Sequence, residues 1–376
     1  MARGQPLRQI GLVQLGCGQV GRALAQMILA QRQQIEQRLG VRLTYVAIAD
    51  SSGLAFQESG LADDKLAGIM RAKADGRSIA ALLNRQPEYS GASVRDEVKQ
   101  ILVAELAAFD DRVLVDVSAA DGMASLLDVA LQRGWGVALA NKLPLVEPLA
   151  RSRTVLAAAG QRLRYEATVG AGLPVIATLR SLLDSGDEVL RIDGSLSGTL
   201  GLICSRLQQG QRFSDIVHEA KTLGYTEPDP RQDLGGMDVA RKALILARTL
   251  GQELELVDVQ VEPLFPQEMA TLSLAEFMDA LQNLDGEYDE KVGAARSSGR
   301  VLRYVAQVGD NGCRVGWQEV GQDDLMAALR GPDNIVRFHT RRYGDNPLAI
   351  VGPGAGPQVT AAGVLADILD LARQRC

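Results

Sequence analysis

The chain has little cysteine and little histidine. Its two histidines, His218 and His339, stand alone without an HExxH motif or paired carboxylates, so a catalytic transition metal is not expected. The four cysteines are widely scattered and form no Cys-x-x-Cys pair; they are Cys17, Cys204, Cys313 and Cys376. Scattered cysteines of this kind indicate reduced thiols and argue against a disulfide framework.

The chain also lacks long apolar runs and basic runs. No apolar stretch reaches the roughly 18 residues that suggest a membrane span, and the amino terminus enters a strand pattern without a cleavable hydrophobic region. A net charge of −6 with mixed charges argues against nucleic acid or an anionic membrane as the main partner. We therefore expect a cytoplasmic protein whose ligand is a small molecule.

A glycine turn near the amino terminus is the first positive signal. Residues 9–15 predict a buried strand and residues from 19 to about 38 an amphipathic helix, with Gly16, Gly18 and Gly21 between or just inside them. In this setting the first glycine permits a tight turn, the second lets the backbone approach a pyrophosphate, and the third lets helix and strand pack closely. Gln19 and Val20 open a helix whose amino terminus favours an anion, so the segment predicts NAD or NADP binding.

Two later strand ends add candidate cofactor contacts. Residues 43–49 predict a strand ending at Asp50, whose carboxylate would bind ribose hydroxyls and repel a 2′-phosphate, which favours NAD; the alternative is a simple turn cap. Residues 113–117 predict a strand followed by Ser118, which either contacts the nicotinamide end of the cofactor or caps a turn. Residues 60–110 look helical and polar, without an assigned role.

Two lysines stand in settings that suggest catalysis. Lys142 follows a predicted strand over residues 136–140, and Pro144 breaks the chain direction directly after it. Lys242 lies four residues after Asp238 on a helix predicted for residues 237–250, so the two side chains share one helical face. The alternatives are a solvated lysine at a strand end and a weak surface ion pair.

The stretch over residues 220–242 resembles the signature of the homoserine dehydrogenase family, and the Asn-Lys-x-Pro turn at 141–144 is also similar to that family. The matching positions are Ala220, Gly224, Tyr225, Thr226, Asp229, Pro230, Asp233, Gly236, Asp238 and Lys242. Relatives often carry two adjacent aspartates where this chain has Gln232 and Asp233, so Asp233 is the carboxylate to which we assign a role.

The resemblance implies an α/β protein: a Rossmann-type dinucleotide-binding domain with a central α+β substrate and dimerisation domain. The implied divisions are residues 1–150 for cofactor binding, 151–340 for substrate and dimer, and 341–376 returning to the cofactor domain with Gly356 beside the cofactor. Within the central domain, strands are expected over residues 188–196, 257–262, 301–308 and 313–320. A helix is expected from 359 to about 373. The family also implies a homodimer.

The implied reaction interconverts L-aspartate 4-semialdehyde and L-homoserine, a step of threonine and methionine biosynthesis. Lys242, Lys142 and Asp238 are the implied catalytic residues, because a cation aimed at the carbonyl oxygen stabilises the negative charge that builds there. Tyr225, Glu227, Asp233 and Asp238 are the implied substrate contacts, with Glu227 at the α-amino group. A structural sodium ion is implied at Glu166, Val169, Ala171 and Leu173, where glycines expose main-chain oxygens that suit a hard cation.

Two other functions are compatible with the same fold. An aspartate-semialdehyde dehydrogenase would need a nucleophilic cysteine, and neither Cys204 nor Cys313 has a glycine-rich nucleophile turn or a paired histidine nearby. A nucleotide-sensing protein that lost catalysis would not need Lys142, Asp238 and Lys242.

Overall fold

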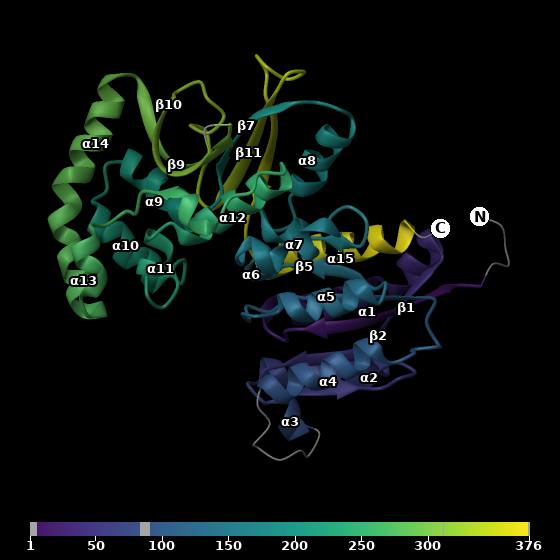
Figure 1. Ribbon diagram of the computed structural model, residues 1–376. Helices are drawn as coiled ribbons and strands as arrows, with labels where there is room; N and C mark the ends of the chain where they lie inside the picture. The colour runs from purple at the N-terminus through teal and green to yellow at the C-terminus, as the bar shows by residue number, and fades with distance from the viewer. Residues whose placement is uncertain (1–5, 83–90, 311, 375–376) are drawn as a thin grey trace. The chain divides into compact units, whose positions relative to one another are not determined.

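The computed structural model describes residues 6–82, 91–310 and 312–374 (Figure 1). The chain divides into two compact units, residues 1–172 with 356–376, and residues 173–355. These divisions differ from the expected ones at 150 and 340, because residues up to 172 and the final helix belong to the first unit, while the strand β12 (Leu348–Pro353) pairs within the sheet of the second unit. Among the described residues, no helix is both long and apolar enough to cross a membrane.

A six-stranded sheet in the order β3-β2-β1-β4-β5-β6 forms the centre of the first unit. Its strands are β1 (Arg8–Leu15), β2 (Val41–Asp50), β3 (Gly53–Phe56), β4 (Asp111–Asp116), β5 (Gly136–Leu139) and β6 (Leu163–Arg164). All neighbours are parallel except β2 and β3. Because both faces of a parallel sheet are covered, β1 and β4 are almost wholly buried, as their apolar sequences predict.

The helices of the first unit connect these strands and cover the sheet. They are α1 (Gln19–Leu39), α2 (Asp63–Ala74), α3 (Ile79–Leu82), α4 (Gly91–Val103), α5 (Ala124–Gln132), α6 (Leu143–Val146), α7 (Leu149–Ala157), the 3-10 turn η1 (Glu166–Thr168) and α15 (Pro357–Arg373). The last helix packs against α1 and β5, as Figure 1 shows in yellow beside the blue and purple elements. Its apolar residues thereby complete the core of a unit that began more than 300 residues earlier.

The second unit is built on a separate, mostly antiparallel sheet in the order β12-β11-β7-β9-β10-β8. Its strands are β7 (Val189–Ser195), β8 (Gln260–Val261), β9 (Arg300–Gly309), β10 (Gly312–Gly321), β11 (Asp333–Thr340) and β12 (Leu348–Pro353). Its helices are α8 (Val175–Asp184), α9 (Gly198–Gln208), α10 (Phe213–Thr222), α11 (Arg231–Leu234), α12 (Met237–Thr249), α13 (Leu274–Ala280) and α14 (Asp285–Ser297). The 3-10 turns are η2 (Leu256–Asp258), η3 (Gln267–Thr271) and η4 (Leu281–Leu284).

Helix α12 is amphipathic as its sequence predicts, and it packs on β9 and β10 with Val239, Ala243 and Leu246 buried. The fold class expected from the sequence is confirmed: a dinucleotide-binding α/β unit joined to an α+β unit.

The strand expected over residues 257–262 is mostly wrong. Residues 256–258 form a 3-10 turn closed by a reciprocal capping box between Glu255 and Asp258, and only Gln260–Val261 pairs with β10. Val257, which suggested strand, is 90% exposed and contributes nothing to a sheet face. Local capping therefore prevails over the β preference of a few apolar residues.

Candidate active site

The glycine turn joins β1 to α1 in the expected way. Gly16 has φ 104°, and a Cβ there would lie 2.7 Å from the Val117 carbonyl oxygen, so only glycine fits. A Cβ on Gly21 would lie 2.1 Å from the Gly16 carbonyl oxygen, which accounts for the close packing of helix and turn. Gly18 has nothing within 4 Å of that position, so its backbone faces open space.

A cleft of about 1060 Å³ opens at this turn. The residues that line it include Gly16, Cys17 and Gly18 of the turn, Asp50 and Ser51 after β2, Val117 to Asp121 after β4, and Lys73, Val94, Arg95 and Val98 from α2 and α4. Its position at the carboxyl ends of parallel strands is where nucleotides bind in such sheets. Gln19 and Val20 form the first turn of α1, beyond the lining residues.

The polar stretch over residues 60–110 contributes part of the cleft wall through α2 and α4. Lys73 from α2 and Arg95 from α4 bring cationic side chains to the cleft wall. Residues 83–90, which belong to that stretch, lie outside the described residues. No sequence pattern predicts this placement, because the two side chains reach the cleft only after the helices fold back on the sheet.

The Asp50 carboxylate is hydrogen-bonded and ion-paired to other residues of the protein. Its Oδ1 accepts hydrogen bonds from the Ser52 amide at 2.8 Å and the Ser52 hydroxyl at 2.5 Å, which is the turn cap considered as the alternative. Its Oδ2 lies 2.6 Å from the Lys73 ammonium, and both side chains are largely buried. The charge that was expected to repel a 2′-phosphate is therefore matched by a lysine 23 residues further along the chain.

The turn that carries Lys142 follows β5 directly. Lys142 is half-buried and immediately precedes the short helix α6, with Pro144 at its second position. Ser118 lies in the cleft wall, and its Oγ accepts a hydrogen bond from the Ala120 amide at 3.2 Å. Ser118 follows β4 and Lys142 follows the neighbouring strand β5, so both lie at the carboxyl ends of strands, where ligands bind in such sheets.

The expected cation segment is a buried turn. Glu166 is 8% exposed, Val169 is fully buried, and Ala171 has an unusual positive φ of 57° after Gly170 at 84°. The Glu166 amide donates to Asp367 Oδ2 at 2.9 Å, and burial raises the pKa of Asp367. No group of three or more His, Cys, Asp and Glu side chains suits a metal in the described part of the chain, so a cation here would depend on one carboxylate and on main-chain oxygens. That donor set, oxygen only, fits sodium chemically.

In the second unit, α12 holds Lys242 in an enclosed setting. The residue is 9% exposed, and its ammonium lies 2.8 Å from the Asp238 carboxylate. It also donates to the Leu196 carbonyl at 2.6 Å, between β7 and α9. An ammonium has three N–H donors, so one remains for a substrate oxygen.

The loop before α12 is held by one side chain from α9 and one from α11. Asp233 Oδ2 accepts from the Glu227 amide at 2.8 Å, and burial raises the pKa of Asp233. Thr199 donates to the Tyr225 carbonyl at 2.6 Å and lies 3.4 Å from Asp233 Oδ1. Tyr225 and Glu227 themselves are exposed, so their side chains are accessible to a small molecule.

Sequence reasoning missed Thr199 and the Leu196 carbonyl. The available signal for Thr199 was the Ser197-Gly198-Thr199 segment, whose serine caps α9 by accepting from the Leu200 amide at 3.2 Å. The Leu196 contact had no signal, because it joins a carbonyl to a side chain 46 residues away.

Cysteine chemistry is not supported. Cys17, Cys204 and Cys313 are buried, and burial raises their pKa to about 12, 11 and 12. Thiols held in this protonated form are poor nucleophiles, so none of these three cysteines suits the role that an aspartate-semialdehyde dehydrogenase needs. Cys17 is a small buried residue of the glycine turn, and Cys376 lies outside the described residues.

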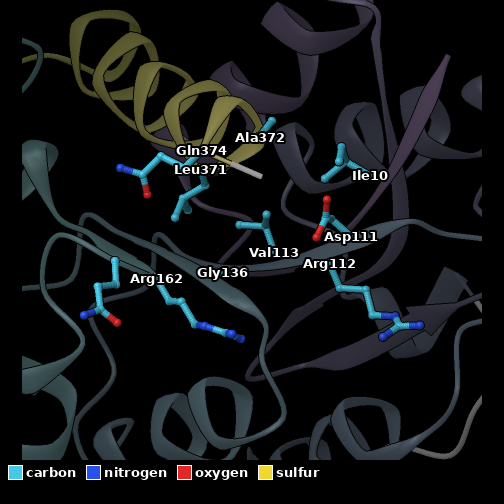
Figure 2. Close-up of a pocket in the computed structure, with 10 residues that line it drawn as sticks. Ile10, Asp111, Arg112, Val113, Gly136, Arg162, Leu371, Ala372 and Gln374 are labelled. Atoms are coloured by element: carbon cyan, nitrogen blue, oxygen red, sulfur yellow. The ribbon is translucent and has the colours of Figure 1, made fainter. Parts of the chain in front are cut away.

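A second cavity lies at the amino ends of the strands of the first sheet, opposite the end that carries the glycine turn. Figure 2 shows Ile10, Asp111, Val113 and Leu371 around it, at the amino ends of β1 and β4 and the end of α15. Its volume of about 20 Å³ is the size of one water molecule. It is too small for a substrate and far along the strands from the glycine turn.

Comparison with known proteins agrees with a cofactor cleft at the glycine turn and a second site at Lys242. The family model described as homoserine dehydrogenase matches residues 174–369, and the one described as homoserine dehydrogenase, NAD binding domain, matches residues 16–166. A homoserine dehydrogenase of Emericella nidulans is 43% identical over 296 residues, which are 74% of this chain and 80% of that protein.

Longer relatives also match. A chloroplastic bifunctional aspartokinase/homoserine dehydrogenase 2 of Zea mays is 37% identical over 364 residues, 95% of this chain but 38% of that protein. The chain thus spans less than half the length of such relatives.

The structure of a homoserine dehydrogenase from a hyperthermophilic archaeon in complex with NADPH superposes with a TM-score of 0.72 at 26% identity, covering 97% of this chain and 98% of that one. Together with the two family matches and the relative in Emericella nidulans, this shows that the chain belongs to the homoserine dehydrogenase family.

Proposed function

We propose that this chain catalyses the NAD(P)-dependent interconversion of L-aspartate 4-semialdehyde and L-homoserine. The observation that carries the proposal is the buried Lys242, which is held by a carboxylate and a carbonyl and keeps one N–H for a substrate oxygen. The dinucleotide cleft of the first unit supports it, because the reaction needs a hydride carrier. The family membership of the chain supports the choice of substrate.

In the direction of reduction, the bound nicotinamide supplies a hydride to the aldehyde carbon. Negative charge then develops on the carbonyl oxygen, and the Lys242 ammonium stabilises that charge and donates the proton that completes the alcohol. Asp238 accepts from the same ammonium at 2.8 Å, so it fixes the direction in which the remaining N–H points. Lys142 acts as a second cation from the cofactor-binding unit.

The substrate carries an α-amino and an α-carboxylate group that must also be recognised. Glu227 is exposed on the loop and is the proposed partner of the α-amino group, with Tyr225 beside it. Asp233 holds the Glu227 amide and is tied to Thr199, so its role is to shape this loop as well as to present a carboxylate.

The cofactor is proposed to bind with its pyrophosphate at Gly16 and Gly18 and its adenosine ribose near Asp50. Gly21 supports that turn from within, and Gly356, which precedes α15 in the same unit, is the proposed further residue beside the cofactor. Because Lys73 matches the charge of Asp50 at 2.6 Å, NADP is as acceptable as NAD at this end of the cleft, which weakens the NAD preference expected from Asp50 alone.

Sodium at Glu166, Val169, Ala171 and Leu173 stays a prediction, as do the homodimer and the cytoplasmic location. The buried carboxylate of Glu166 and the positive φ of Ala171 support the cation site. The Leu173 carbonyl already accepts from the Val175 amide at 2.8 Å, so it would contribute its second lone pair.

The test is an assay of the purified chain for homoserine-dependent reduction of NAD and of NADP, followed at the absorbance of the reduced nicotinamide. We expect turnover with at least one of the two cofactors. Absence of turnover with both, in a folded protein that binds NADPH, would refute the proposed activity.

A further inference from the structure

We propose that Asp116 and Asn141 form a buried clamp that positions two segments of the cofactor-binding unit, the Ser118 loop (residues 117–121) and the Lys142 turn (residues 141–143). Both residues act through others, so they are positioning residues and not catalytic ones. The proposal rests on the proposed function, since it assigns the clamp a role in holding the cofactor wall and the second cation of that reaction.

Asp116 is the acceptor at the centre of the clamp. It is fully buried at the end of β4, and its Oδ1 accepts from the Ser118 amide at 3.0 Å and the Ser118 hydroxyl at 2.6 Å. Its Oδ2 accepts from Asn141 Nδ2 at 3.0 Å. A buried carboxylate is expensive unless donors surround it, so these three donors are what keep it in place.

Asn141 connects that carboxylate to the Lys142 turn. It is 3% exposed, and its Nδ2 also donates to the Ala120 carbonyl at 2.9 Å, while its Oδ1 accepts from the Leu143 amide at 3.1 Å. Rotating the amide by half a turn would set its oxygen against two acceptors and its nitrogen against a donor. One orientation is therefore fixed, and through it the Ser118 loop, β4 and the Lys142 turn become a single rigid assembly.

The clamp also decides what Ser118 offers to a ligand. The only hydroxyl hydrogen of Ser118 goes to Asp116, and one lone pair of Oγ receives the Ala120 amide. What remains on the cleft wall is one acceptor site, so a group bound at Ser118 Oγ has to donate a hydrogen bond. The carboxamide of a nicotinamide carries such a donor.

The chemical test exploits the polarity of the Asp116–Asn141 hydrogen bond. Asp116→Asn keeps the size and shape of the side chain, but it places an amide N–H opposite another donor, either Asn141 Nδ2 or the Ser118 amide. Asn141→Asp sets two carboxylates against each other. The double variant Asp116→Asn/Asn141→Asp restores this hydrogen bond in the reversed direction but leaves the new carboxylate opposite the Ala120 carbonyl. A specific clamp therefore predicts partial rescue relative to Asn141→Asp, whereas general damage to the core predicts further loss.

The matched control is Asp111→Asn. Asp111 lies on the same strand at its opposite end, where it is ion-paired with Arg8 and remote from the glycine turn. For each variant we would measure thermal unfolding, the Kd for NADPH by nucleotide fluorescence, and kcat and KM for homoserine.

We expect each single variant to weaken NADPH binding and to lower kcat by about tenfold or more, with a smaller change in KM for homoserine, and the double variant to recover part of the losses seen in Asn141→Asp. Asp111→Asn should leave Kd and kcat at the wild-type values. Wild-type Kd and kcat in Asp116→Asn, or a double variant worse than both single ones, would overturn the clamp. If Asp116→Asn does not fold, Asn141→Ala carries the same measurements.

Failure of the proposed function is distinguishable from failure of the clamp. A wild-type protein that binds NADPH but does not oxidise homoserine refutes the activity, while the Kd measurements on the variants still decide whether the clamp positions the cofactor wall.

Discussion

At the scale of single residues, the lysine ammonium groups of the two candidate sites are paired with carboxylates or carbonyls of the protein itself. Lys242 is bound to Asp238 and Leu196, and Lys73 to Asp50. The first of these pairs is visible in the sequence, because residues four apart on a helix share a face. The second is not, because its partners lie 23 residues apart on a strand end and a separate helix. Sequence reasoning therefore identified Asp50 but not the charge that balances it.

The Asp50–Lys73 pair gives a prediction about cofactor choice. Asp50→Ala leaves Lys73 without its carboxylate and should raise the NADP to NAD ratio of kcat/KM several-fold, because an unpaired ammonium attracts a 2′-phosphate. Lys73→Ala should lower the same ratio several-fold. Steady-state kinetics with both cofactors would measure both changes.

Lys65 on the same helix is exposed, so Lys65→Ala is the matched control and should leave the ratio unchanged. An unchanged ratio in both the Asp50 and the Lys73 variants would show that this pair does not face the adenosine ribose.

At the scale of elements, strands and helices with strong apolar patterns were predicted well and short or capped elements poorly. β1, β4 and α12 follow their sequence patterns closely. The strand at residues 257–262 was wrong because a capping box between Glu255 and Asp258 closes a 3-10 turn there. β11 and β12 were not predicted, since β11 pairs with β7 through residues more than 130 positions apart and β12 pairs with β11.

Two glycines of the same turn allow the effect of a substitution on packing to be measured separately from its effect on cofactor binding. Gly21→Ala places a Cβ 2.1 Å from the Gly16 carbonyl oxygen and should destabilise the fold by about 1–3 kcal/mol, the usual cost of overpacking. Gly18→Ala meets nothing within 4 Å and has an extended backbone that alanine can adopt, so its melting temperature should stay near wild type.

Gly18→Ala should nevertheless weaken NADPH binding by about tenfold or more, because its methyl group occupies the path of the pyrophosphate. Calorimetry for stability and nucleotide fluorescence for binding would separate the two effects. Equal losses of stability in the two variants would contradict the assignment of Gly18 to the ligand side.

At the scale of the whole molecule, the first of the two units is assembled from distant parts of the chain. The first unit takes residues 356–376 from the end of the sequence, and α15 lies against α1. A cofactor-binding unit was predicted from the glycine turn, and the second unit from the family resemblance. Their boundaries were not predicted correctly, because they depend on which sheet β6 and β12 join, and strand pairing is not a local property.

The second unit leads to a prediction about assembly. Its six-stranded sheet has edge strands β12 and β8, and exposed strand edges are usually covered or paired. We expect a stable dimer of twice the 40.2 kDa chain mass in light scattering at micromolar concentration. A particle of the single-chain mass over the whole concentration range would refute it.

The central claim is that Lys242 donates the proton to the carbonyl oxygen, and one set of kcat measurements tests it most directly. Lys242→Ala should lower kcat for homoserine oxidation and for aldehyde reduction by roughly 10²-fold or more, the usual scale for a positioned general acid or base, while NADPH binding stays intact. Lys291→Ala is the matched control, since Lys291 and Glu287 form an i,i+4 pair of the same 2.8 Å length on an exposed helix face, and its kcat should not change. A loss of only a few-fold in Lys242→Ala, with turnover abolished instead by Lys142→Ala, would contradict the account and exchange the roles of the two lysines.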